Sequence, residues 1–194
     1  MFKVWICSTP DYETPICMSK KEGNMNKRIL IAYATKAGSS AEIASAIAET
    51  ISTRGYIVDV TPIKQKPNLS RYDAVIIGSA IRMGNWLSEA VDYIKNNQSA
   101  LNKLPLALFT VHLNNLGDDE TSKANRLTYL NPIRPLVKPV EEVFFAGKMD
   151  FSRLSILDRL AAKMVKAVEE DKRDWNKIRS WAEAIFVAEN PIML

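Results

Sequence analysis

The chain has 194 residues, of which 26 are Lys or Arg and 22 are Asp or Glu, so its formal net charge is +4. Apolar residues make up 47% of the chain, which is ordinary for a globular protein and excludes general disorder. No stretch approaches the roughly 18 uninterrupted apolar residues that cross a bilayer. One His and two Cys exclude a multi-His metal site and a disulfide scaffold. We expect a cytoplasmic protein without a metal ion.

The positive charge is unevenly distributed along the chain. Residues 25–146 hold 14 basic and 11 acidic groups, whereas the much shorter segment 147–180 holds 9 and 6. Neither segment has the dense basic stripe with interleaved aromatic residues that is typical of nucleic-acid binders. We therefore expect no nucleic-acid partner.

Residues 1–26 differ in character from the rest of the chain. They begin with a short apolar run and lack the form of a secretory signal. We expect a leader that lies outside the fold, with Met25 as the natural start. A redox pair of Cys7 and Cys17 is the less favoured alternative, because their spacing is not the short one that lowers a thiol pKa.

From Arg28 onwards, short apolar runs alternate with segments whose apolar residues recur at helical spacing. Such runs are typical of strands buried on both faces of a parallel sheet. In chain order they predict a strand at 29–33, a helix at 41–54, strands at 56–60 and 74–79, a helix at 86–97, strands at 106–111 and 142–147, and a final helix from 174 to 188.

Five strands joined by long connections predict an α/β fold with a doubly wound five-stranded parallel sheet, because parallel crossovers are long and right-handed. We expect one domain over residues 27–190. Ligands of such sheets bind beyond the carboxyl ends of the strands, so the loops that follow the strands are the candidate sites.

The loop after the first strand is Thr35-Lys36-Ala37-Gly38-Ser39-Ser40, and it opens directly into a helix. Small and hydroxylated residues around a Gly suit a phosphate held by backbone N–H groups. An ordinary capped turn, with Ser39 or Ser40 as the N-cap, is the alternative. The loop has neither the ending of a P-loop nor the glycine pattern of a dinucleotide-binding turn.

Two further loops leave the same edge of the predicted sheet. The loop from Ser79 to Trp86 is flanked by glycines and ends in an aromatic residue, on which a planar ligand would stack. Alternatively, Trp86 simply packs at the start of the helix. The loop from Thr110 to Gly117 is polar, and its His112 is more often a hydrogen-bonded strand-end residue than a catalytic base.

The segment from Tyr33 to Ala44 resembles the FMN phosphate loop of the flavodoxin family. The resemblance extends through Gly78–Gly84, Phe145–Gly147 and Asp174-Trp175, and within the family it points to the menaquinone-dependent protoporphyrinogen oxidases. It covers residues 27–186 and implies a sheet order of 2-1-3-4-5. The residues it implies for FMN are Thr35, Lys36, Ala37, Gly38, Ser39 and Ser40 at the phosphate, with Ser79, Ala80, Ile81, Arg82, Met83, Gly84, Asn85, Trp86, Thr110, Val111, His112, Leu113, Asn114 and Gly117 beside the isoalloxazine ring.

The sequence departs from electron-carrying flavodoxins in two ways. Flavodoxins usually have Thr-Gly-Asn-Thr where this chain has Ala37-Gly38-Ser39-Ser40, so one hydroxyl is missing and phosphate binding leans more on backbone donors and Lys36. The acidic surface of a carrier is also absent, which favours an enzyme.

A late basic segment carries an apolar stripe at helical spacing. We expect a helix docked on the sheet, or else an amphipathic surface for an anionic membrane, a quinone-bearing complex or an acidic substrate. The stripe consists of Leu157, Leu160, Ala161, Met164, Val165 and Val168.

The resemblance implies an FMN-binding oxidoreductase that oxidises protoporphyrinogen IX, or a similar anionic substrate, with a quinone as acceptor. Arg82, Arg153 or Arg159 would meet the substrate carboxylates; no catalytic residue is predicted. The alternatives are an FMN electron-transfer protein that docks on redox partners, and a module that has lost FMN. The expected partners are a small-molecule substrate or a redox partner protein, and a quinone or the periphery of a membrane.

Overall fold

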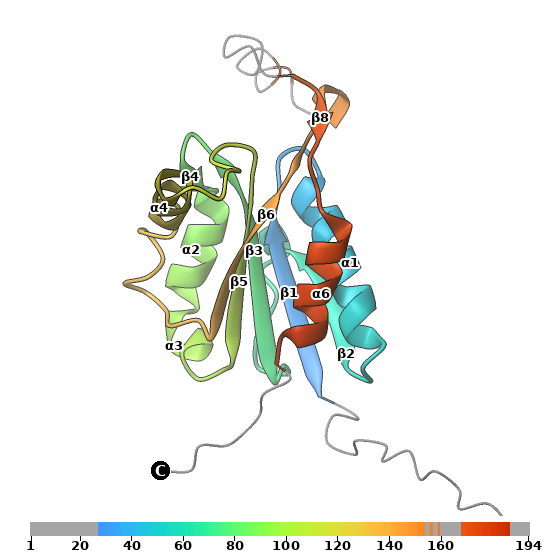
Figure 1. Cartoon of the computed structure of the whole chain (residues 1–194). Coiled ribbons are helices and arrows are strands. Elements are labelled where there is room, and N and C mark those ends of the chain that lie inside the picture. The colour runs from blue at the N-terminus through green and yellow to red at the C-terminus, as the bar shows by residue number, and fades with distance from the viewer. Residues whose placement is uncertain (1–26, 154–155, 157–158, 160–167, 187–194) are drawn as a thin grey trace, which may run out of the picture.

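The computed structural model describes residues 27–153, 156, 159 and 168–186, and its centre is a parallel sheet in the order β2-β1-β3-β5-β6 (Figure 1). This confirms the predicted fold and the order 2-1-3-4-5, because β4 is a short extra strand that pairs antiparallel with β3. The strands of the sheet are β1 (Arg28–Ala34), β2 (Ile57–Pro62), β3 (Ala74–Arg82), β4 (Asn85–Trp86), β5 (Leu106–His112) and β6 (Glu141–Ala146).

Helices cover both faces of this sheet and give the molecule two hydrophobic clusters (Figure 1). One cluster lies under α1 and α6 and includes Ile47 and Trp181; the other lies under α2 and α3 and includes Ile94 and Leu101. All seven residues of β5 are buried, as expected of a strand covered on both sides. The helices are α1 (Ser39–Ser52), η1 (Ile63–Gln65), α2 (Ser88–Asn96), α3 (Gln98–Leu101), α4 (Glu120–Thr128) and α6 (Trp175–Ala184).

The segment from Ser79 to Trp86 is largely a β-hairpin, so its prediction as a loop is wrong. Strand β3 continues to Arg82, which pairs with Asn85 across a two-residue turn. Met83 and Gly84 form this turn with φ of +51° and +77°, and positive φ at both central residues matches the right-handed twist of a hairpin. Because Trp86 belongs to β4, α2 begins at Ser88 and not at 86 as predicted.

A second, smaller sheet follows β6 and projects beyond the carboxyl edge of the main sheet (Figure 1). It consists of β7 (Lys148–Met149) and β8 (Glu170–Asp171), with the short helix η2 (Phe151–Arg153) after β7. The predicted leader at 1–26 lies outside the described residues. So does the apolar stripe at 157–168, except for Val168, which is 70% exposed. Helix α6 ends at Ala184, short of the predicted residue 188, which is also outside.

No helix within the described ranges combines the length and the apolar character needed to cross a membrane.

Candidate functional site

The loop between β1 and α1 has the backbone shape of an anion-binding turn. Gly38 has a φ of +85°, a left-handed conformation that glycine adopts without strain. The N–H of Gly38 donates to Thr35 Oγ1 at 3.0 Å, which closes the turn. Gly38 is itself the N-cap of α1, without a side-chain capping bond, so the alternative with Ser39 or Ser40 as the N-cap is wrong.

The two serines that begin α1 are both buried and differ in their partners. Ser39 Oγ accepts a hydrogen bond from the N–H of Lys148 in β7 at 3.0 Å. Ser40 is fully buried, and its Oγ has no hydrogen-bond partner in the described part of the chain. Buried polar atoms are almost always paired, and the first N–H groups of a helix have no acceptor inside it. An unpaired hydroxyl at a helix N-terminus is therefore what an absent anion would complete.

Lys36 and Ala37 form the outer side of this loop. Lys36 is exposed, and its Nζ lies 4.0 Å from a carboxylate oxygen of Glu89 in the first turn of α2. Ala37 is half-buried and has no hydroxyl to offer. This contact places the Lys36 cation near the first turn of α2, at the carboxyl edge of the sheet.

The β3–β4 hairpin separates the second group of predicted residues into buried and exposed ones. Ser79 is buried, and its Oγ accepts from the N–H of Leu87 at 3.1 Å, which fastens β3 to the start of α2. Trp86 is 3% exposed, and its indole N–H donates to Thr110 Oγ1 at 3.0 Å. Trp86 thus packs in the core, as the alternative prediction had it. The residues that face outward or are half-buried are Ala80, Ile81, Arg82, Met83, Gly84 and Asn85.

The third loop follows β5, and its first residues are also buried. His112 is 5% exposed, and its Nδ1–H donates to the carbonyl of Asn114 at 2.6 Å. Because a carbonyl only accepts, this bond places the proton of the neutral ring on Nδ1. Burial lowers the pKa of His112, and the rings of Tyr129 and Phe144 lie 5.8 and 6.1 Å from it between centroids. His112 is therefore a neutral, hydrogen-bonded strand-end residue.

The rest of this loop is held by α4 and by the chain that follows it. Arg126 Nη1 donates to the carbonyls of Asn115 and Gly117, both at 2.6 Å. The side-chain amide of Asn115 donates to the Tyr129 hydroxyl at 2.8 Å. Leu113 and Asn114 lie at the outer end of the loop, half-buried and exposed. The structure thus brings the three predicted loops to one edge, but it buries Trp86, Thr110, Val111 and His112 beneath that edge.

An ion-pair cluster that the sequence did not indicate joins the small sheet to the first turn of α1. Glu42 accepts from Arg153 through one carboxylate oxygen and from Arg173 through the other. The hydrogen bond from Arg173 is the main cause that lowers the pKa of Glu42, so this carboxylate is charged at neutral pH. The guanidinium of Arg153 also lies against Gly38, because a Cβ built on that glycine would come within 2.7 Å of Arg153 Nη1.

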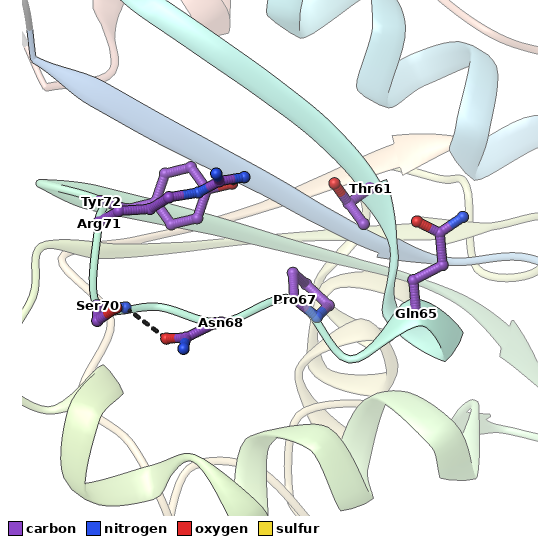
Figure 2. Close-up of a pocket in the computed structure, with 7 residues that line it drawn as sticks. All are labelled: Thr61, Gln65, Pro67, Asn68, Ser70, Arg71 and Tyr72. Carbon is purple, nitrogen blue, oxygen red and sulfur yellow. Dashed lines mark hydrogen bonds between the residues drawn. The ribbon is translucent and has the colours of Figure 1, made fainter.

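A surface pocket of about 410 Å³ lies elsewhere, along the connection between β2 and β3 (Figure 2). Within it, the N–H of Ser70 donates to Asn68 Oδ1 at 2.9 Å, and the Arg71 guanidinium lies 5.3 Å from the Tyr72 ring centroid. It shares no residue with the three loops, so we do not assign the site to it. The lining residues are Thr61, Gln65, Pro67, Asn68, Ser70, Arg71 and Tyr72.

Known proteins resemble this chain over most of its length. A protoporphyrinogen IX dehydrogenase (quinone) from Escherichia coli K12 is 26% identical over 170 residues, which cover 81% of this chain and 94% of the relative. Two solved structures share the fold. An oxidised flavodoxin 2 from Bacillus cereus has 18% identity and a TM-score of 0.50, and the match covers 80% of this chain and 94% of that structure. A Fusobacterium nucleatum flavodoxin mutant bound to flavin mononucleotide has 12% identity and a TM-score of 0.50, and the match covers 81% of this chain and 94% of that structure. A family model described as a flavodoxin domain matches residues 30–176. The chain therefore belongs to the flavodoxin domain family.

Proposed function

We propose that this chain binds FMN at the carboxyl edge of its sheet and acts as an oxidoreductase that oxidises protoporphyrinogen IX with a quinone as acceptor. The observation that carries the FMN site is the unpaired, fully buried hydroxyl of Ser40 at the N-terminus of α1. The match to a protoporphyrinogen IX dehydrogenase over nearly the whole length of that relative supports the reaction.

The loop from Thr35 to Ser40 fits the phosphate of FMN. It combines a left-handed Gly38, the N-terminus of α1 and the unpaired Ser40 hydroxyl. Helix N-termini favour anions because the helix dipole and the N–H groups point at them. Ala37 has no hydroxyl, so the phosphate would depend on these donors and on Lys36.

The other two loops would flank the isoalloxazine ring. Some of their residues would contact the flavin, and others would hold the loops in place. Ile81 to Asn85 and Leu113 to Asn114 are the parts that reach the surface or are half-buried, so they would contact the flavin. Trp86, Thr110 and His112 are buried and would hold those loops in place through their hydrogen bonds. When bound, FMN supplies the transfer of hydrogen and electrons, while the protein positions the flavin and its substrate.

The carboxyl edge also presents apolar side chains to an incoming substrate. The three most exposed large apolar residues of the described chain are Met83 at 91%, Ile156 at 87% and Val168 at 70%. Met83 is at the tip of the β3–β4 hairpin, and the other two lie between β7 and β8. The hairpin and the segment after β7 thus each offer exposed apolar contacts to a ligand. A large tetrapyrrole or an apolar quinone fits such an edge.

Arg82 is the proposed partner of the substrate carboxylates, since it is exposed on the hairpin. The other two candidates lie in η2 and in the segment that follows it. Arg153 pairs with Glu42, and Arg159 donates to the carbonyl of Phe151 through Nε at 3.0 Å and Nη2 at 2.8 Å.

An anaerobic assay with protein reconstituted in FMN tests this function. We expect protoporphyrinogen IX to be converted to fluorescent protoporphyrin while a menaquinone analogue is reduced. Absence of turnover at full FMN loading contradicts the proposal. Fast reduction by a ferredoxin-like donor without turnover would instead identify an electron-transfer protein.

The proposal extends to contact with a membrane surface, where apolar quinones reside. It is supported by Ile156 and Val168, whose exposed side chains lie in the basic segment 147–180. We expect the protein to sediment with phosphatidylglycerol vesicles and not with phosphatidylcholine vesicles, because anionic lipid adds electrostatic attraction. Equal recovery in both supernatants contradicts membrane contact.

A further inference from the structure

Arg153 places a guanidinium against the turn of the phosphate loop. Its side chain is 50% exposed, and its Nη1 lies so close to Gly38 that a Cβ there would come within 2.7 Å of it. Arg153 comes from η2, 111 residues after its partner Glu42 in α1. Helix η2 therefore brings a second cation to the loop, in addition to the loop's own Lys36.

Arg173 shows what a purely structural arginine looks like in the same cluster. Its side chain is 6% exposed, and its guanidinium contacts two carboxylates and an aromatic ring. It donates to Glu42, pairs with Asp171 at 2.5 and 2.8 Å, and lies 4.5 Å from the centroid of the Trp175 ring. Arg173 thus divides its guanidinium between Glu42 and Asp171, and Arg153 reaches the other carboxylate oxygen of Glu42.

The orientation of Arg153 is set by acidic groups on two elements. Glu42 holds Nη1, and Asp150 Oδ2 lies 3.7 Å from Nε. Within the described residues, Nη2 has no acceptor. A planar guanidinium fixed at one side retains N–H groups for a second anion, and arginine binds phosphate through such paired donors.

We infer that Arg153 is part of the phosphate site and supplies the positive charge that the phosphate of FMN meets there, with Glu42 as the residue that positions it. This inference rests on the proposed FMN binding. It explains how the loop tolerates Ala37: a charged donor from η2 replaces the missing hydroxyl.

Titration of the apoprotein with two flavins tests this role, with flavin fluorescence as the readout. FMN and riboflavin differ only in the phosphate. We expect Arg153→Gln to weaken FMN binding roughly tenfold, as for loss of one charge-assisted hydrogen bond, and to leave riboflavin binding unchanged. Arg153→Lys retains the charge and should fall between the wild type and Arg153→Gln. Added salt should weaken FMN binding more in the wild type than in Arg153→Gln.

Two further variants separate charge from architecture. Glu42→Gln removes the anchor that positions Arg153, so it should weaken FMN binding less than Arg153→Gln does and leave riboflavin binding unchanged. If Arg153 only fastens the small sheet through Glu42, both variants will weaken FMN and riboflavin binding alike, and the inference is wrong. Arg71→Gln makes the same charge change just before β3, at the opposite edge of the sheet, where the side chain is 65% exposed. It should leave both affinities unchanged.

The outcomes keep the two proposals apart. A wild-type protein that binds no FMN overturns the proposed function itself. If the wild type binds FMN and Arg153→Gln binds it equally tightly, only the role of Arg153 is overturned. The same holds if Arg153→Gln weakens riboflavin binding as much as FMN binding. The free energy of unfolding of each apo variant, measured in urea, shows whether the substitution has disturbed the fold.

Discussion

Ser39 and Ser40 are adjacent and buried, yet their hydroxyls have opposite consequences for the folded protein. Ser39 accepts the N–H of Lys148, whereas Ser40 Oγ has no partner in the described chain. A buried polar atom without a partner costs free energy, and a lost acceptor leaves its donor unpaired.

Substitution of each serine by alanine should separate stability from FMN affinity. Ser39→Ala leaves the Lys148 N–H without an acceptor and should lower the free energy of unfolding by about 1–2 kcal/mol. Ser40→Ala should leave the stability of the apoprotein unchanged or raise it by up to about 1 kcal/mol, while weakening FMN binding. Urea denaturation and fluorescence titration measure the two effects. Equal destabilisation by both substitutions would show that Ser40 is satisfied in the apoprotein.

His112 should make the stability of the protein depend on pH in a narrow range. It is the only His in the chain, and burial lowers its pKa from the ordinary value of 6.5, with Arg126 and Lys177 adding to the effect. Below pH 6.5 the unfolded chain therefore binds a proton that the folded chain does not. The contribution of the buried neutral ring is complete above pH 6.5 and is lost as the pH falls through the lowered pKa.

We expect the free energy of unfolding of the wild type to decrease as the pH falls from about 7.5 to about 5.5. Carboxylates of ordinary pKa stay ionised in this range and so do not contribute to the change. His112→Gln should flatten that dependence, because Gln does not titrate. Urea unfolding at several pH values measures it. A variant with the same slope as the wild type would assign the dependence to another group.

At the level of elements, the β3–β4 hairpin combines a strained turn with an exposed apolar tip. Met83 has a φ of +51° and is 91% exposed. A bulky residue in the left-handed region is unfavourable, whereas Asn followed by Gly is the preferred pair for such a turn.

Met83→Asn should therefore stabilise the protein by about 0.5–1 kcal/mol and lower kcat/KM for the apolar substrate. Thermal unfolding and the porphyrin assay measure the two changes. A variant that is less stable would show that the Met side chain packs on a neighbour, and unchanged kinetics would remove Met83 from the substrate site.

The sequence predicts the fold best where buried apolar residues recur regularly along the chain. The apolar runs in β1, β3 and β5 predicted the sheet, and the loops that end these strands predicted the edge that carries the site. Helix α4 was not predicted, because none of its residues is buried and so no apolar stripe marks it. Its start has a local signal, since Asp119 caps it by accepting the N–H of Ser122 at 2.9 Å.

The missed parts of the site depend on contacts between distant segments. Glu42 meets Arg153 and Arg173 across 111 and 131 residues, and neither arginine belongs to a recognisable motif. The sequence predicts a loop at the hairpin because its two-residue turn contains Met83-Gly84 and not a more usual pair such as Asn-Gly. The ion-pair cluster and the hairpin both depend on which residues contact each other in the fold, and a single sequence does not display these contacts.

At the scale of the whole molecule, the net charge of +4 should aid capture of a carboxylate-bearing substrate. Oppositely charged partners associate faster, and salt screens this attraction. We expect kcat/KM for protoporphyrinogen IX to fall as ionic strength rises from about 10 mM to about 150 mM. The same constant for an uncharged quinone should not change. Steady-state kinetics with each substrate varied in turn measures both, and equal salt effects on the two would contradict electrostatic capture.

The base of the small sheet holds together the two ends of the segment between β7 and β8. Lys148 pairs with Asp171, and the N–H of Lys172 donates to the carbonyl of Gly147 at 3.1 Å, so the chain leaves and returns at one point. Doubling the length of a segment closed in this way costs only about 0.6 kcal/mol. Evolution can therefore lengthen, shorten or exchange the residues between η2 and β8 to suit new substrates. The two hydrophobic clusters and the arginines beside the phosphate loop would remain as they are.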